Sequence, residues 1–127
     1  MITDALFELL DLNIDRNQIY FIKPGNSAFY PPLNGYKDWL ERCITKGKRT
    51  LIIGGCTLNS CVRVSSIETV DHFKNRNLRV VVDLSICGAR SGSFLPSSLY
   101  AGESAVESAI RQMTAADVQV VKRVEWQ

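Results

Sequence analysis

One cysteine stands where its side chain could act as a nucleophile. Cys61 follows an apolar run at 51–53 and the pair Gly54-Gly55, and a helical pattern begins next to it. A strand, a glycine turn and a helix start place a residue at the carboxyl edge of an α/β sheet, where ligands bind. The positive end of the helix dipole there lowers the pKa of a thiol. Cys61 is therefore predicted to be an activated thiol, with a buried, unreactive cysteine as the alternative.

A lysine is predicted to lie on the same edge of the sheet. Residues 18–22 have the pattern of a buried strand, and Lys23 follows directly. A lysine near a thiol stabilises the thiolate and can later move protons. The alternative is an ordinary lysine at a strand end that reaches water.

The elements that must position these two residues alternate between strand and helix. Helices are predicted at 3–12, 36–45, 59–75 and 103–115, and strands at 18–22, 50–53, 78–84 and 118–124. The run Val80-Val81-Val82 suits a parallel strand covered on both faces. We expect one α/β domain over residues 1–127, with a parallel sheet and helices on both faces.

Composition and charge exclude several classes of protein. The net charge of +2 gives no support for binding to nucleic acid or to a membrane surface. No apolar stretch approaches the ~20 residues of a membrane span, and the N-terminus does not have the pattern of a signal peptide. No P-loop or GxGxxG pattern is present, so no nucleotide cofactor is expected.

The cysteines predict reduced thiols and no metal site. Cys43, Cys56, Cys61 and Cys87 form no CxxC pair, and His72 is the single histidine. Reduced thiols are typical of a cytoplasmic protein. His72 lies among polar residues and is predicted to be exposed, without a catalytic role. Redox use of Cys56 and Cys61 is a weaker alternative, because their spacing matches no exchange motif.

Two motifs together resemble the isochorismatase-like cysteine hydrolases. The chain has KPGNSAF at 23–29 and GCTLNSCVR at 55–63. The family has Lys-x-x-x-Ser-Ala-Phe, then a strand, then Gly-x-x-x-x-x-Cys-Val opening a helix. The second motif most resembles the amidohydrolase branch, typified by N-carbamoylsarcosine amidase and nicotinamidase. The similarity covers about residues 18–124. Ser65-Ser66 replaces a Thr-Ala pair that is frequent in the family, a mild change.

The resemblance implies a role for each matched residue. Cys61 would attack an amide or carbamoyl carbonyl, and Lys23 would belong to an Asp-Lys-Cys triad. The backbone N–H groups of Thr57 and Cys61 would form the oxyanion hole, after a cis Cys56–Thr57 peptide bond. No cofactor is implied.

Three further residues are predicted to line the substrate pocket: Phe29, Asn59 and Arg90. Each has a structural alternative. Phe29 would be a core residue, Asn59 a helix cap and Arg90 a solvated loop residue.

The chain departs from the family at the triad aspartate. In the family this residue lies on the first, central strand, far upstream of the lysine, but here 22 residues precede Lys23. Asp4, Asp11 and Asp15 fall on the predicted first helix and its following loop. Asp83 ends a predicted strand, where the family commonly has an acidic residue without catalytic duty.

The fold is therefore expected to be isochorismatase-like without its usual first strand. An open sheet edge would favour a homo-oligomer or a complex with a chain that supplies the strand. The predicted function is hydrolysis of a small amide or carbamoyl substrate through a Cys61 acyl-enzyme. The alternative is a catalytically impaired relative that serves as a binding or assembly subunit.

Overall fold

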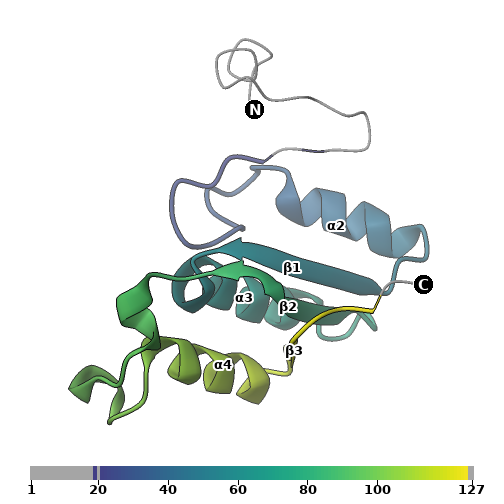
Figure 1. Cartoon of the computed structure of the whole chain (residues 1–127). Helices are drawn as coiled ribbons and strands as arrows, with labels where there is room; N and C mark the ends of the chain where they lie inside the picture. Colours follow the sequence, from purple (N-terminus) through teal and green to yellow (C-terminus); the bar gives the residue numbers. More distant parts are fainter. Residues whose placement is uncertain (1–18, 20, 126–127) are drawn as a thin grey trace.

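The computed structural model describes residues 19 and 21–125, and their strands form one parallel sheet (Figure 1). Strand β1 (Thr50–Cys56) pairs with β2 (Arg79–Gly88), and β2 pairs with β3 (Gln119–Val121). The β-branched run 80–82 lies in β2, between the other two strands, and is 0–4% exposed. The predicted parallel α/β fold is confirmed.

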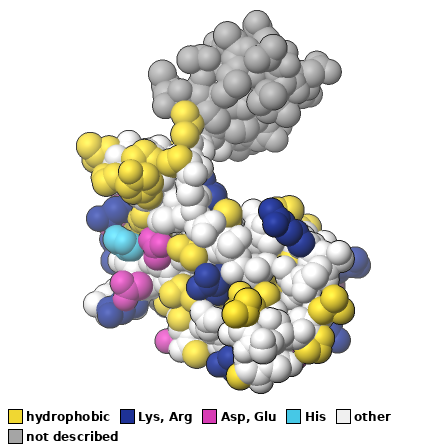
Figure 2. All heavy atoms as spheres, turned by 90° about the vertical axis from the view of Figure 1, so that its left-hand side faces the viewer, with side chains coloured by type: hydrophobic (Ala, Val, Ile, Leu, Met, Phe, Trp, Pro, Cys, Tyr) yellow, Lys and Arg dark blue, Asp and Glu magenta, His cyan; other side chains and the backbone are white. Residues whose placement is uncertain are grey.

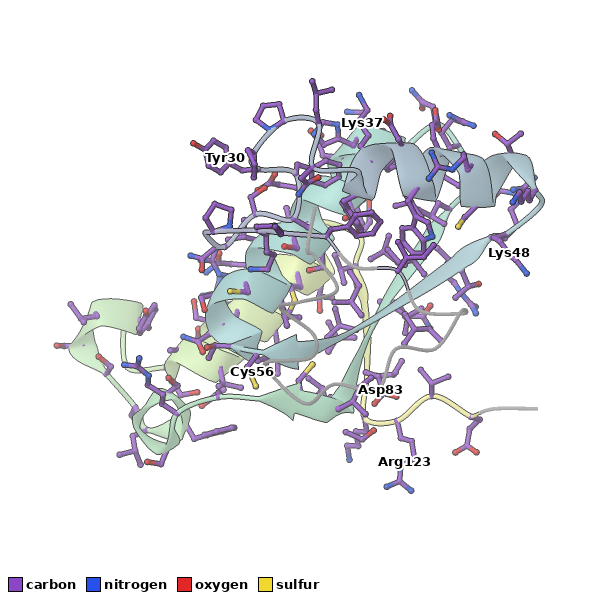
Figure 3. All side chains as sticks on the ribbon, turned by 90° about the horizontal axis from the view of Figure 1, so that it is seen from above. Tyr30, Lys37, Lys48, Cys56, Asp83 and Arg123 are labelled. Atoms are coloured by element: carbon purple, nitrogen blue, oxygen red, sulfur yellow. The ribbon has the colours of Figure 1, made fainter. Side chains whose placement is uncertain are left out.

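Three helices cover one face of this sheet: α2 (Tyr36–Thr45), α3 (Arg63–Phe73) and α4 (Ala105–Ala115). Val80 and Val82 point to this face and pack into a core with Met113 of α4. Figure 3, a view from above, shows the helices on the same side of the strands. The expectation of helices on both faces is thus not met by the part of the chain that the structure describes.

Helix α2 packs on the end of α3 through its apolar stripe. Leu40 and Ile44, one turn apart, form a second core cluster with Phe73, and Leu51 of β1 lies against it. The helix begins after Gly35, whose φ of +100° is available to glycine without strain. No helix in the described part is long and apolar enough to cross a membrane.

The carboxyl end of β1 is shaped by its glycine pair. A Cβ on Gly54 would lie 2.5 Å from the Ile86 side chain, so β1 and β2 approach closely there. Gly55 has a φ of +123°, and the pairing register shifts between Ile53 and Gly55. The chain then turns through a π-helical segment, Leu58–Val62, directly into α3.

The predicted elements agree with the structure best near the sheet centre. The helix predicted at 36–45 is confirmed, and β1 and β2 extend further along the chain than the predicted 50–53 and 78–84. The helix predicted at 59–75 is divided into the π-helical turn and α3, which ends at Phe73. The predicted strand 118–124 is shorter, 119–121. Ser104 caps α4 by accepting a hydrogen bond from the Glu107 N–H, so that helix begins at 105 and not at 103.

The strand predicted at 18–22 is wrong for its described residues. Ile19, Phe21 and Ile22 have no strand conformation. Phe21 instead packs its ring against Tyr36 and Trp39 of α2, with ring centroids 6.1 and 5.8 Å away. Aromatic packing, not a sheet ladder, therefore holds this segment. The predicted helix 3–12 and its aspartates lie outside the described residues.

Candidate active site

Cys61 lies in the π-helical turn between β1 and α3. The Thr57 carbonyl accepts hydrogen bonds from the Ser60 and Val62 N–H groups at 3.1 and 3.2 Å, which closes the turn. The turn places Cys61 at the N-terminal end of α3, as the sequence predicts. Its side chain is partly exposed and forms no disulfide, so the sulfur is available for chemistry.

Lys23 reaches the Cys61 sulfur from an irregular segment. Its ammonium group donates to the Gly25 carbonyl at 2.6 Å and lies close enough to the Cys61 thiol to lower its pKa. The structure thus brings together the two residues that the sequence predicts to meet. The sequence predicts that a strand ending at Lys23 positions this side chain, but the structure has an irregular segment there.

The surroundings of Cys61 favour its thiolate. Burial raises the pKa of the thiol, but hydrogen bonds from Lys23, from the Thr57 N–H and from Ser60, together with the Lys23 charge, outweigh it. The pKa of Cys61 is therefore below its ordinary value. Since the thiolate is the nucleophilic form of cysteine, this shift raises the reactive fraction at neutral pH.

The Thr57 backbone lies next to the Cys61 sulfur. The Cys56–Thr57 peptide bond is cis, which confirms the expected cis bond. The Thr57 carbonyl points into the turn, whereas its N–H is directed at the Cys61 sulfur. A donor beside a nucleophilic sulfur is suitably placed for the oxygen of a carbonyl under attack.

An open cavity of about 420 Å³ lies beside the sulfur. Its walls are mainly apolar and come from residues near the start of the described chain, from α2, from β1 and from the Cys61 turn. They include Phe21, Lys23, Tyr36, Trp39, Leu51, Ile52, Ile53, Cys56, Cys61 and Ser65. A few polar groups on an apolar wall are typical of small-molecule sites.

Phe29, Asn59 and Arg90 do not line this cavity. Phe29 stacks on the exposed His72 ring, with centroids 4.1 Å apart, and packs against Tyr36. Figure 2 shows a group of hydrophobic side chains near the single histidine. Leu33, in the loop 27–35 that also carries Phe29, is 96% exposed. The structure therefore places Phe29 in a packed group of rings with Tyr36 and His72, separate from the sulfur.

The other two residues have different surroundings. Asn59 lies in the π-helical turn, and its side-chain oxygen is buried without a hydrogen-bond partner in the described structure. Arg90 is exposed and precedes a short 3₁₀ turn, Ser91–Phe94. The structure does not bring either side chain together with Cys61 at the cavity wall.

Asp83 is engaged away from the cavity. Its carboxylate accepts hydrogen bonds from the Ser85 hydroxyl at 2.6 Å, from the Ser85 N–H at 2.9 Å and from the Val124 N–H at 3.0 Å. The hydrogen bonds from Ser85 and Val124, with the charge of Arg123, hold its pKa below the ordinary value. Figure 3 shows Asp83 near the segment that carries Arg123. It shows Cys56 separately, at the end of β1. These contacts give Asp83 a structural place in the sheet.

No acidic side chain is found among the described residues that line the cavity. Within the same part of the chain, no three residues of the types that bind metals come together as a cluster. The functional groups assembled at the sulfur are therefore an ammonium group, backbone N–H groups, hydroxyls and one amide.

That amide belongs to Asn26, a residue that the sequence reasoning missed. The Cys61 sulfur lies 3.3 Å from Asn26 Oδ1. Ser65 was missed as well: its hydroxyl donates to the Asn26 carbonyl at 2.8 Å and accepts from the Ala28 N–H at 3.0 Å. Both residues fall inside the matched region, but their contacts join positions 35 to 39 residues apart, which a local pattern does not contain. Ser65 belongs to the Ser65-Ser66 pair, which is interpreted from the sequence as a mild change from the Thr-Ala pair of the family.

Comparison with known structures identifies the fold. A structure of YcaC from Pseudomonas aeruginosa, an isochorismatase-family hydrolase, matches over 95% of this chain with a TM-score of 0.55 and 21% sequence identity. The chain has an isochorismatase-like fold. It spans 48% of the length of the YcaC chain. No protein-family model and no curated protein sequence matches it.

Proposed function

We propose that this chain provides the nucleophile of a cysteine-dependent hydrolase that acts on a small amide or carbamoyl substrate. The observation that carries the proposal is the position of the Cys61 sulfur. It lies on the wall of an apolar cavity, beside Lys23 and the Thr57 N–H, and its pKa is lowered. The isochorismatase-like fold supports the same reading.

In the proposed reaction, the Cys61 thiolate attacks the substrate carbonyl carbon and forms a C–S bond. The carbonyl oxygen gains negative charge, which the Thr57 and Cys61 N–H groups stabilise; losing one such donor typically lowers turnover by ~10²–10³. The C–N bond then breaks, and the amine leaves with a proton from Lys23 Nζ. Water attacks the thioester and passes a proton to Lys23, which releases the acid and restores the thiolate. A cytoplasmic location, where thiols stay reduced, suits this chemistry.

A second reading is a catalytically impaired binding or assembly subunit. It is favoured by the absence of an acidic side chain among the described residues of the cavity wall. Without a carboxylate to exchange protons with Lys23, proton transfer to the leaving amine would be slow. The chain would then bind its small-molecule ligand, or form a slow acyl adduct, without efficient turnover.

We further propose that the outer edge of β1 takes up another strand. In the described sheet β1 is an end strand, and Gly54, Gly55 and Cys56 are exposed there. Unpaired backbone groups along a sheet edge are a template for pairing with another segment. The strand would come from a second copy, from another chain or from the same polypeptide outside these 127 residues. A well-folded monomer of this chain in sedimentation at micromolar concentration would contradict the proposal.

The nucleophile can be tested with two kinds of electrophile. Acrylamide is suitable because thiolates add to it, and the YcaC structure carries covalent acrylamide. Intact-mass spectrometry should detect a fast acrylamide adduct that is lost in Cys61→Ala and kept in Cys43→Ala, whose cysteine lies on α2. A panel of small amides should give acyl adducts on Cys61.

The outcomes separate the readings. Acrylamide addition at Cys61 no faster than at the cysteines of the unfolded chain would overturn the proposal of an activated nucleophile. Fast addition of acrylamide with no acyl adduct from any amide would favour the impaired subunit. Acyl adducts that turn over would establish the hydrolase.

A further inference from the structure

Asn26 contacts the reacting atom of the proposed site. Its Oδ1 lies 3.3 Å from the Cys61 sulfur, an arrangement in which the thiol S–H donates to the amide oxygen. A thiolate has no proton to donate and only accepts hydrogen bonds. The two ends of an asparagine amide have the same shape, so a half-turn about χ2 places Nδ2 where Oδ1 lies.

We propose that Asn26 is a catalytic residue that turns its amide N–H toward the sulfur when Cys61 is ionised. The inference rests on the proposed thiolate chemistry of Cys61 and deepens it, because it adds a donor to the nucleophile. Asn26 would accept a hydrogen bond from the thiol through Oδ1 and donate one to the thiolate through Nδ2. One side chain would then serve both protonation states.

The backbone of Asn26 is fixed although the residue itself is exposed. The Ser65 hydroxyl, 8% exposed on α3, holds the Asn26 carbonyl at 2.8 Å and the Ala28 N–H at 3.0 Å. Ser27 donates to Glu68 of α3 at 2.8 Å. Because the Asn26 carbonyl and the two residues that follow it are held on α3, the position of the amide is restricted, but the amide can still rotate about χ2.

The donor is useful because the other groups at the sulfur are already shared. Lys23 Nζ donates to the Gly25 carbonyl at 2.6 Å, which occupies one of its three N–H groups. Among the described residues, Lys23 is the one whose charge lowers the pKa of Cys61. In the proposed reaction Lys23 also exchanges protons with the leaving amine and with water, whereas a neutral amide donor can stabilise the thiolate before the attack and when it is re-formed. Asn26 is such a donor.

The substitution Asn26→Asp tests the inference with almost no change in shape. A carboxylate at this position still accepts from the thiol, but it repels the thiolate and has no N–H to donate. We expect the pKa of Cys61 to rise in Asn26→Ala and to rise further in Asn26→Asp. Asn26→Ala removes one hydrogen bond to the thiolate at an exposed site, which lowers the thiolate fraction at pH 7. We therefore expect its alkylation rate at pH 7 to be about threefold to tenfold lower.

The measurement is the pH dependence of iodoacetamide addition, followed on the Cys61 peptide by mass spectrometry in the full chain. Asn75→Asp is the matched control, because it adds the same charge at an exposed asparagine beyond the far end of α3. Thermal melts verify that each variant is folded. An Asn26→Asp profile equal to that of Asn75→Asp would overturn the inference.

The same data separate this inference from the proposed function. If Cys61 titrates as an ordinary thiol in the unmodified chain, the activated nucleophile is contradicted. The difference between Asn26→Asp and Asn75→Asp still reports the contact in that case. A purely structural role for Asn26 would move the melting temperature of Asn26→Ala and leave its Cys61 profile unchanged, because alanine adds no charge that could itself repel the thiolate.

Discussion

Replacing Ser65 with alanine should weaken both the fold and the nucleophile. The Ser65 hydroxyl makes two hydrogen bonds to the backbone of the segment that carries Lys23 and Asn26. Each bond is worth about 0.5–1.5 kcal/mol, and the two partners would be left unpaired in a partly buried place. We therefore expect Ser65→Ala to lower the free energy of unfolding by about 1–3 kcal/mol.

The effect on Cys61 follows from the same contacts. Once the segment is released, Lys23 and Asn26 are no longer held at the sulfur, so the lowered pKa of Cys61 should move back toward the ordinary value. Urea unfolding measures the first effect. The pH dependence of Cys61 alkylation measures the second.

The neighbouring serine provides the control. Ser66 is 0% exposed, and its hydroxyl donates only to the Arg63 carbonyl one turn earlier in α3. Both substitutions remove one buried oxygen atom, so the cost of the space left behind largely cancels between them. Ser66→Ala should leave the Cys61 profile unchanged. If the two variants gave the same Cys61 profile, the Ser65 anchor would have no part in activating the thiol.

Three further outcomes are expected. Lys23→Met should raise the pKa of Cys61 and slow its alkylation at pH 7, and Lys23→Arg should keep most of the rate; equal rates in all three proteins would remove Lys23 from the site. Met113→Ala should cost about 2–5 kcal/mol in urea unfolding, because this fully buried side chain leaves a cavity, whereas exposed Thr114→Ala should cost little. The lowered pKa of Asp83 means that its carboxylate stabilises the fold above about pH 4, and that this contribution is lost as pH falls through the folded-state pKa. Asp83→Asn should therefore destabilise at pH 6, and its difference from the unmodified chain should shrink as pH falls through the folded-state pKa of Asp83.

The sequence predicted the position of Cys61 because its signal is local. A β-branched run followed by two glycines defines where β1 ends, and the helix that follows must begin at the next turn. The close approach of Ile86 to Gly54 explains why glycine is needed there. The glycine pair in the sequence and the close strand approach in the structure both mark the end of β1.

The sequence pattern predicted that Lys23 lies near Cys61, but it attributed this position to a strand at 18–22 that its described residues do not form. An apolar run at 18–22 has the same pattern whether it pairs in a sheet or packs by its side chains. The contact of Phe21 with two aromatic rings of α2 depends on residues 15 and 18 positions later, which a local pattern does not contain. The motif around Lys23 therefore predicted its position better than the periodicity did.

The predicted pocket residues that lie away from the cavity have a related cause. Phe29 belongs to the matched motif, but its ring turns to His72 and Tyr36 because those rings are within stacking distance. The Ser65 contact was equally out of reach, since it joins positions 37 and 39 residues apart. Side-chain direction within a correctly identified motif depends on such distant neighbours.

The position of β1 links two properties of this protein. The cavity wall includes three residues of β1, the edge strand of the described sheet: Leu51, Ile52 and Ile53. Any segment that pairs with β1 would therefore become a wall of the chamber in which Cys61 reacts. Molecular recognition and quaternary structure would then depend on the same three side chains, so that evolution could alter ligand choice by exchanging the neighbouring strand while leaving the nucleophile intact.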